Sequence, residues 1–212
     1  MSQEVEIKTI KPFGPAIAKV SIPKKILHEL NTYIDNLIKD EKKSKEQDHG
    51  YSLVGNVKQE IKLEDKIIED SRWKEFLEKC ISIWIESITR KKINEFKLID
   101  SWVVRQFQNE YNPAHWHNGH ISGAGFLKVP SSFGKHTQEK PAEYKGGNLQ
   151  LIHGARMFLC KSTFNIAPQV GDFYFFPNYL MHTVFPFKDT KEERRSISFN
   201  ANIDDNIYNV YS

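Results

Sequence analysis

The chain has 212 residues and a formal net charge of +3, and 39% of its residues are apolar while 27% are charged. This length and composition suffice for a substantial core, and the interspersed Lys and Glu residues exclude a strongly basic surface for nucleic acid. The chain has no signal-peptide core, no apolar run near the ~20 residues of a membrane span, and only Cys80 and Cys160 as thiols, which together predict a cytoplasmic protein.

The first half of the chain is predicted to be mainly helical. Residues 4–22 alternate loosely between apolar and polar side chains, which indicates one or two short strands. Apolar residues then recur at helical spacing over 24–41, whereas the polar segment 41–50 is predicted to be a loop. Residues 64–92 carry a second apolar stripe at three- and four-residue spacing, which is typical of a helix packed on a core.

From about residue 97 the chain changes to short β-rich segments separated by Gly, Pro and Asn. Many short strands with such turns are typical of a sandwich or barrel. The segments are 98–109, 121–129, 147–152, 156–160, 172–176, 182–187 and 194–202. The long polar loop 130–146 has the length of a lid or a binding loop. We therefore expect one domain over 1–212, in which a helical region, 1–96, supports a β core, 97–212.

Three histidines, His115, His117 and His120, fall within six residues directly before a predicted strand. Side chains at i and i+2 on an extended backbone point to the same face, so the first two can reach one metal ion. His120 lies at odd offsets from both and is expected beside the site rather than in it. Two polar rings at the start of a strand need a shared partner, and imidazole suits iron, zinc, copper and nickel. The pattern predicts a metal site at His115 and His117.

The last third of the chain offers a third ligand and an anion-binding group. An aromatic strand leads into His182, the best candidate for the third ligand, although a buried, hydrogen-bonded histidine is the alternative. In the following strand Arg194 and Ser196 share one face, and Arg195 points to the other. Arginine suits bidentate binding of a carboxylate, and an adjacent serine adds a hydrogen bond. Salt-bridged arginines on a surface strand are the alternative.

The order of these motifs resembles the Fe(II)/2-oxoglutarate-dependent oxygenases, and within them the prolyl-hydroxylase-like branch of bacteria and phages. The resemblance covers roughly residues 100–202, and its motifs are His-x-His, Gly146-Gly-Asn-Leu149, Gly171-Asp-Phe-Tyr-Phe-Phe-Pro177, His182 and Arg194-x-Ser196. It implies a mainly β fold, a double-stranded β-helix or jelly roll, buttressed by the N-terminal helices.

The resemblance also implies roles for individual residues. The expected Fe(II) ligands are His115, His117 and His182. The expected partner of the distal carboxylate of the cosubstrate, 2-oxoglutarate, is Arg194, assisted by Ser196. His117 departs from the family, which usually has Asp or Glu at this position. A neutral ligand raises the net charge of the site by one unit and strengthens its attraction for a dianion.

The predicted function is that of a non-haem Fe(II)- and 2-oxoglutarate-dependent dioxygenase. It would hydroxylate an unidentified substrate, with a peptidyl proline as one option, and release succinate and CO2. Its expected partners are 2-oxoglutarate, dioxygen and that substrate, with neither nucleic acid nor membrane. One alternative is a cupin-like dioxygenase or isomerase that uses the three histidines without 2-oxoglutarate, but the glutamate usual in that pattern is Ile121 here. A second alternative is a jelly-roll binding module without catalysis.

Overall fold

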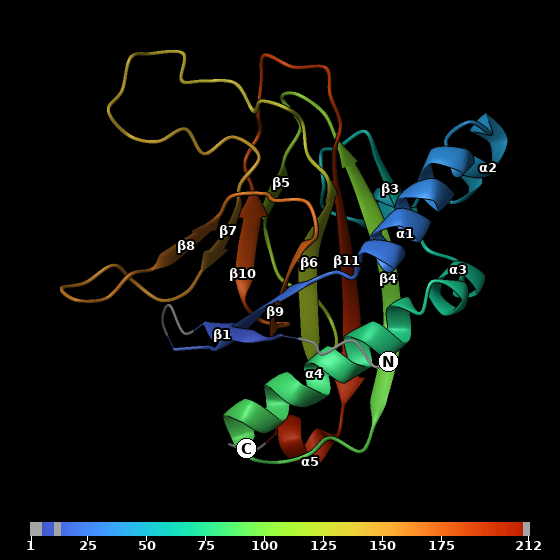
Figure 1. Ribbon diagram of the computed structural model, residues 1–212. Coiled ribbons are helices and arrows are strands. Elements are labelled where there is room, and N and C mark those ends of the chain that lie inside the picture. Colours follow the sequence, from blue (N-terminus) through green and yellow to red (C-terminus); the bar gives the residue numbers. More distant parts are fainter. Residues whose placement is uncertain (1–5, 11–13, 210–212) are drawn as a thin grey trace.

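The computed structural model describes residues 6–10 and 14–209 (Figure 1). The helices are α1 (Lys24–Leu37), α2 (Glu41–Glu46), α3 (Asp65–Asp70), α4 (Trp73–Thr89) and α5 (Asp205–Tyr208), with a 3-10 turn, η1 (Gly50–Ser52). The strands are β1 (Lys8–Ile10), β2 (Ile17–Ser21), β3 (Gln59–Lys62), β4 (Phe96–Gln106), β5 (Asn112–His115), β6 (Ile121–Lys128), β7 (Leu149–Ile152), β8 (Thr163–Ile166), β9 (Asp172–Pro177), β10 (Met181–Val184) and β11 (Arg194–Ile203). No helix in the described ranges is long and apolar enough to cross a bilayer.

The strands form two antiparallel sheets that pack face to face. The large sheet has the order β1-β2-β9-β6-β11-β4-β3, and the small sheet has the order β5-β10-β7-β8. A shared apolar cluster joins them, with Phe126 and Phe176 from the large sheet against Leu149 and Leu151 from the small one. Two antiparallel sheets packed in this way make a jelly roll. The predicted mainly β jelly roll is confirmed.

Strand β9 shows why the large sheet is apolar on both faces. Phe173 and Phe175 pack into the cluster that contains the helices, whereas Tyr174 and Phe176 face the small sheet. Side chains alternate along a strand, so an unbroken aromatic run indicates burial on both sides. On the neighbouring β6, a Cβ at Gly125 would lie 2.2 Å from the Phe173 ring, so glycine is needed here to leave room for this ring.

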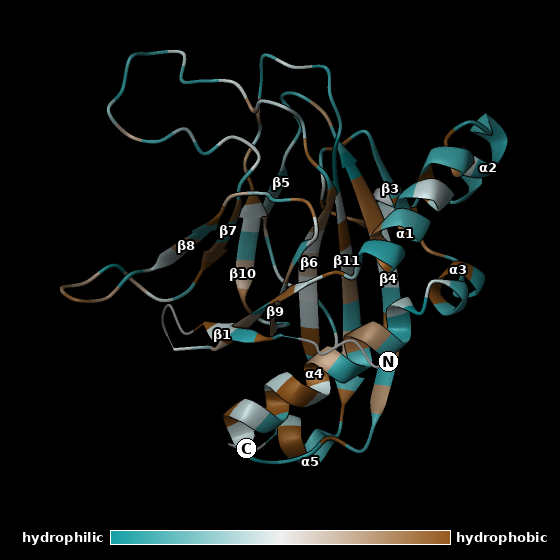
Figure 2. Cartoon of the chain, viewed as in Figure 1, coloured by the Kyte–Doolittle hydropathy of each residue, from teal (hydrophilic) through white to brown (hydrophobic). Residues whose placement is uncertain are grey.

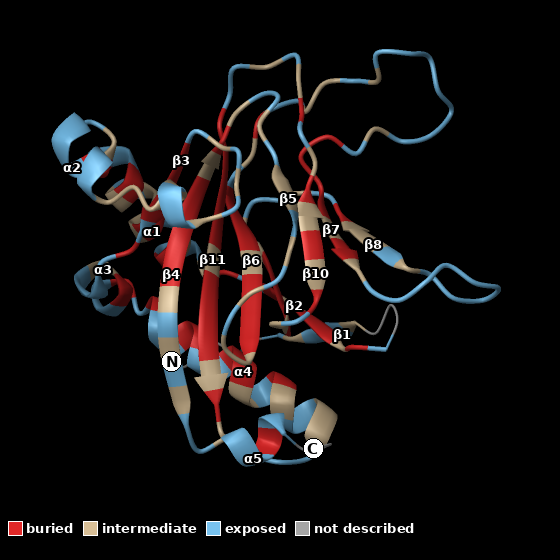
Figure 3. Cartoon of the chain, turned by 180° about the vertical axis from the view of Figure 1, so that it is seen from behind, coloured by how far each residue is buried: buried red, intermediate tan, exposed pale blue. Residues whose placement is uncertain are grey.

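Helices α1 and α4 cover the outer face of the large sheet (Figures 1 and 3). Their apolar stripes turn toward the strands, and Figure 2 shows the apolar residues along α4. The indole Nε1 of Trp73 donates a hydrogen bond to Ser101 Oγ on β4 at 3.0 Å, which fixes α4 on the sheet. Cys80 is fully buried in this layer, and burial raises the pKa of its thiol to about 12. The expectation that N-terminal helices buttress the core is confirmed.

Several local predictions were wrong. The segment 41–50 is not a loop, because α2 begins there, capped by the Asp40 carboxylate, which accepts the N–H of Lys43. Residues 156–160 form no strand; β8 lies further on. Strands β3 and β5, whose sequences are Gln-Glu-Ile-Lys and Asn-Pro-Ala-His, were not foreseen, because neither shows apolar alternation. With β1 and β2, β3 also shows that the first half of the chain adds strands to the large sheet.

Candidate metal centre

Two of the three expected ligands lie opposite each other on neighbouring strands of the small sheet. His115 ends β5, His182 lies in β10, and the two residues are directly paired in the antiparallel register. Directly opposed residues of antiparallel strands lie on the same face, with Cβ atoms about 5 Å apart. The ring centres of the two histidines are accordingly 4.3 Å apart. Strand pairing therefore brings together two side chains that are distant in the sequence.

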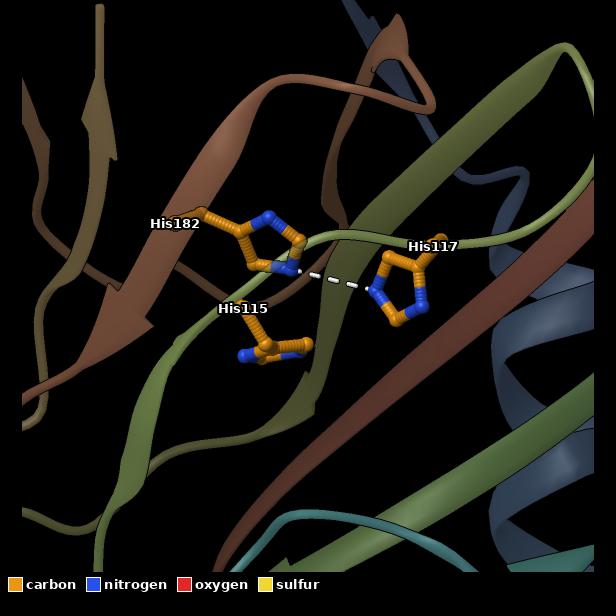
Figure 4. Close-up of side chains that lie close together, drawn as sticks. All are labelled: His115, His117 and His182. Atoms are coloured by element: carbon orange, nitrogen blue, oxygen red, sulfur yellow. Dashed lines mark hydrogen bonds between the residues drawn. The ribbon is translucent and has the colours of Figure 1, made fainter.

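The third histidine, His117, lies just beyond β5, in the segment that leads to β6. Its backbone is held on both sides by Asn178: the His117 N–H donates to Asn178 O at 3.0 Å, and Asn178 Nδ2 donates to His117 O at 3.2 Å. The Nε2 atoms of His117 and His182 lie 3.1 Å apart (Figure 4). All three rings thus converge, and their potential ligand atoms lie within 4.8 Å of one another.

Hydrogen bonds determine which nitrogen of each ring faces the others. His115 Nδ1 lies 2.7 Å from Pro113 O, and His182 Nδ1 lies 2.9 Å from Leu180 O. A carbonyl oxygen only accepts, so each Nδ1 carries the hydrogen and each Nε2 keeps its lone pair. Burial, followed by the proximity of His182 and His115, lowers the pKa of His117 to about 2, and burial, followed by the proximity of His115, lowers that of His182 to about 3. Burial also lowers the pKa of His115. Neutral imidazole is the form that binds metals.

The donor set fits a transition-metal ion. Two nitrogens about 3 Å apart have the spacing of neighbouring ligands on an ion with metal–nitrogen bonds of about 2.1 Å. Ligand histidines characteristically donate their other N–H to a carbonyl, as His115 and His182 do here. Within the described part of the chain no other group of three His, Cys, Asp or Glu residues shows this geometry.

Arg194 adds a buried positive charge to the same cavity. Only 2% of the surface of Arg194 is exposed. Its Nε donates a hydrogen bond to Gly147 O at 2.9 Å, and its Nη1 donates one to Ser196 Oγ at 3.1 Å. Both acceptors are neutral, and no acidic side chain of the described residues pairs with the guanidinium. Burial lowers the pKa of Arg194 to about 9. A buried cation without a counter-ion is costly, so this group fits an anionic ligand such as a carboxylate.

The adjacent Arg195 is used differently. Its guanidinium points to the helical side of the sheet, where Nη2 lies 2.7 Å from Asp35 on α1 and Nε lies 2.9 Å from Glu193. Nη1 donates to Asn31 Oδ1 at 2.9 Å. Arg195 therefore joins β11 to α1, whereas Arg194 faces the cavity, in line with the alternation along the strand.

One cavity of about 370 Å³ contains all five predicted site residues, His115, His117, His182, Arg194 and Ser196. Further lining residues come from the large sheet, including Trp102 and Val104 on β4, which lie opposite Ser198 and Ser196 on β11. Several polar lining residues were not predicted from the sequence, including Glu60, Asp100 and Asn112. Alternation along β4 was the available signal for Asp100, but Glu60 and Asn112 lie on the two unforeseen strands.

His120 and the long loop lie outside this cavity. His120 Nδ1 is 3.0 Å from Ile203 O, and its ring stacks on Tyr208 with centres 4.0 Å apart, so it packs α5 against β11. The loop 130–146 extends beyond the end of the sandwich (Figure 1) and contributes none of the lining residues. Its role as a lid stays a prediction.

Residues 100–200 match the family model described as "Putative 2OG-Fe(II) oxygenase". These residues belong to the 2OG-Fe(II) oxygenase family. The family uses Fe(II) and 2-oxoglutarate, so the predicted cofactors are confirmed, together with the resemblance found in the sequence. The match supports an oxygenase or a related enzyme. No curated protein matches the sequence.

Solved structures of 2OG-Fe(II) oxygenases share the fold of nearly the whole chain. A prolyl-4-hydroxylase from Pseudomonas putida is 12% identical, with a TM-score of 0.55 over 87% of this chain and 91% of that one. A viral collagen prolyl hydroxylase from Paramecium bursaria Chlorella virus-1, in complex with 2OG, is 16% identical, with a TM-score of 0.53 over 87% and 94%. The non-haem α-ketoglutarate-dependent epimerase SnoN of nogalamycin biosynthesis is 14% identical, with a TM-score of 0.54 over 86% and 76%. Identities this low show the fold alone.

The Asn178 side chain is expected to position His117 for metal binding. In Asn178→Ala the backbone N–H of His117 keeps its acceptor, but the His117 carbonyl loses its side-chain donor, so the third ring is held less firmly. Residues that orient a metal ligand typically change metal affinity 10–100-fold, and we expect a loss of about tenfold, measured by calorimetric titration with Mn(II).

Tyr208→Phe is the matched control, because it removes only the hydrogen bond from the Tyr208 hydroxyl to Asn178 Oδ1, 3.1 Å long. We expect this variant to bind Mn(II) within about twofold of the wild type. Equal affinities for Asn178→Ala and the wild type would show that the bond to the His117 carbonyl does not position the ring.

Proposed function

We propose that this protein is an Fe(II)- and 2-oxoglutarate-dependent dioxygenase that hydroxylates a substrate bound in the cavity. One observation supports this above all: three neutral imidazoles line the same cavity as a buried guanidinium that pairs with no acid among the described residues. His115, His117 and His182 would hold Fe(II). Arg194, with Ser196, would bind the distal carboxylate of 2-oxoglutarate. Together the metal and cosubstrate supply oxidation of a C–H bond by dioxygen, with conversion of 2-oxoglutarate to succinate and CO2.

The residues of the chain would bind and orient the metal and the cosubstrate, and they would exclude water from the site. The Arg194 fork is fixed by Gly147 O and Ser196 Oγ, so little side-chain freedom is lost when a carboxylate binds. The neutral His117 leaves the metal site one charge unit more positive than a carboxylate ligand would, and this favours a dianionic cosubstrate. Leu149 and Val184 line the cavity with apolar surface, which keeps water from the reacting groups.

A hydroxylation is the simplest reaction for such a site, and a peptidyl proline is one substrate to consider. The prolyl hydroxylases among the similar structures support that option, but the epimerase shares the same fold. A fold does not determine the reaction, which depends on the groups that face the substrate.

The proposed cofactors give a direct test. Anaerobic addition of Fe(II) and 2-oxoglutarate to the metal-free protein is expected to produce a visible charge-transfer band, and admission of air is expected to yield succinate. Arg194→Ala should lack the band at the cosubstrate concentration that saturates the wild type. Neither band nor succinate in the wild type would overturn the proposal, and oxygen uptake that is independent of 2-oxoglutarate would favour a cupin-like enzyme instead.

A further inference from the structure

Three side chains with oxygen acceptors lie on the part of the cavity wall built by β3, β4 and β5. Glu60, Asp100 and Asn112 all line the cavity. Each has one buried side-chain oxygen, Glu60 Oε2, Asp100 Oδ1 or Asn112 Oδ1, that has no hydrogen-bond donor among the described residues. Buried polar atoms are nearly always hydrogen-bonded, so three such oxygens on one cavity point to a ligand that carries donors.

Glu60 is the most deeply buried of the three, with 2% of its surface exposed. It lies on β3, the edge strand of the large sheet, and is paired with Val104, which is in turn paired with Ser196 on β11. The three residues therefore form one row across the sheet and face the same cavity. Strand spacing places the backbones of Glu60 and Ser196 about 10 Å apart, so the Glu60 wall is separate from the proposed carboxylate site.

No cation of the described residues pairs with Glu60. The charged neighbour that affects the pKa of Glu60 is another acid, Asp48. Asp48 Oδ1 accepts hydrogen bonds from the backbone N–H groups of Gly50, at 3.0 Å, and Glu60, at 3.3 Å. Burial and, after it, the charge of Asp48 raise the pKa of Glu60 to about 7. A carboxylate buried in this way is stabilised by a bound positive charge.

The surroundings hold these acceptors in place and give the cavity an apolar rim. A Cβ at Gly55 would lie 2.6 Å from Asn112 Oδ1 and 2.9 Å from Glu60 Oε1, so the bare backbone of this loop packs directly on both side chains. Val54 and Trp116 also line the cavity, although 54% and 65% of their surfaces are exposed. An alkyl chain can pack against such a rim while its polar end reaches the acceptors.

We propose that this wall binds the positively charged nitrogen group of an aliphatic amine or guanidine substrate, with Glu60 as the counter-ion. This deepens the proposed oxygenase function, on which it rests, by naming the substrate class. An ammonium has three donors and a guanidinium has five, which matches a wall of acceptors from Glu60, Asp100 and Asn112. A peptidyl proline, whose ring nitrogen has no hydrogen, would leave these acceptors unused. A lysine or arginine side chain has both the alkyl stem and the cationic end.

The test compares probes that differ only at the charged end. N-acetyl-lysine methylamide, its arginine counterpart and N-acetyl-norleucine methylamide are titrated into the protein, with and without Mn(II) and 2-oxoglutarate. Binding is followed by tryptophan fluorescence, because Trp102 and Trp116 line the cavity. We expect the better cationic probe to bind at least about tenfold more tightly than the norleucine probe, the factor given by a charge-assisted hydrogen bond. The lysine and arginine arms distinguish the two kinds of cation.

Glu60→Gln keeps the shape of the side chain and removes its charge, so the preference should fall to within about twofold. Glu69→Gln, an exposed position on α3, is the matched control and should keep the full preference. Asp100→Asn provides a second variant if Glu60→Gln does not fold, and it should reduce the preference at least about threefold. Equal binding of charged and neutral probes, or a preference that survives Glu60→Gln, would overturn the proposal.

The pH dependence of the affinity for the lysine probe is an independent test of Glu60 as the counter-ion. Glu60 attracts a cation only when its carboxylate is ionised, and with a pKa of about 7 its ionised fraction rises from roughly 0.1 at pH 6 to roughly 0.9 at pH 8. Affinity for the lysine probe should therefore rise nearly tenfold over this range, while the probe itself stays charged. Neither His117 nor His182 titrates there, because their pKa values lie far lower. The rise should be absent in Glu60→Gln, and a flat profile in the wild type would count against Glu60 as the counter-ion.

These measurements separate the two proposals, because binding of the probes is measured by fluorescence and does not require catalysis. A wild-type protein that prefers cationic probes but makes no succinate would overturn the oxygenase function and leave the amine site standing. Normal succinate formation without any preference for a cationic probe would overturn the amine site alone.

Discussion

Replacing Arg194 by methionine is expected to raise the KM for 2-oxoglutarate by a factor of about 100 or more. The guanidinium would make two charge-assisted hydrogen bonds to the distal carboxylate, each worth about 1.5–3 kcal/mol. Methionine has a similar length and is apolar, so it can keep the packing on the Phe126 ring, whose centre lies 5.1 Å from the guanidinium carbon. Succinate formation as a function of 2-oxoglutarate concentration measures the effect.

The same substitution should not destabilise the ligand-free protein. Burial lowers the pKa of Arg194 to about 9, which means that the folded state disfavours this charge. Replacing it by an apolar group should raise the free energy of unfolding by on the order of 1 kcal/mol, measured by urea denaturation. Arg194→Lys keeps the charge without the fork and should give an intermediate KM. A KM within about threefold of the wild type for Arg194→Met would contradict the assigned role.

Much of the candidate site follows from local backbone geometry, which is why the sequence indicated it. Alternation along a strand distinguishes Arg194, which faces the cavity, from Arg195, which bonds Asp35 and Glu193 on the other side. The spacing of His115 and His117 allows both rings to reach one centre. Such inferences depend only on neighbouring residues, so they hold once the strand itself is recognised.

Other features depend on contacts between distant segments and leave no local pattern. Strand β5 contains Pro113, which removes a donor, and it is tolerated because β5 is the edge strand of the small sheet. Asn178 holds His117 only because β9 and β10 bring it there. Glu60 looked like one more charged residue in a polar segment. Its burial becomes visible only when β3 is placed at the edge of the large sheet.

His182→Ala is expected to have the largest effect on the metal centre. The side chain is 4% exposed, its Nδ1 is committed to Leu180 O, and its Nε2 lies 3.1 Å from that of His117. Removing one of three ligands should lower the affinity for Mn(II) at least about 100-fold, since even residues that only orient a ligand change affinity 10–100-fold. Formation of succinate at micromolar Fe(II) should fall below detection.

A thermal-unfolding measurement separates loss of the ligand from loss of the fold. In the wild type, Mn(II) at about 100 times its Kd should stabilise the protein by about 2.7 kcal/mol, and in His182→Ala the same concentration should stabilise it by about 0.4 kcal/mol or less. The metal-free variant should itself lose about 1–3 kcal/mol, because a small cavity forms and the Leu180 carbonyl loses its donor. His28→Ala, at an exposed position on α1, should retain both the increment and the activity. If His182→Ala bound Mn(II) within about threefold of the wild type, the three imidazoles would not be a shared metal site, and the oxygenase mechanism would lose its support in this structure.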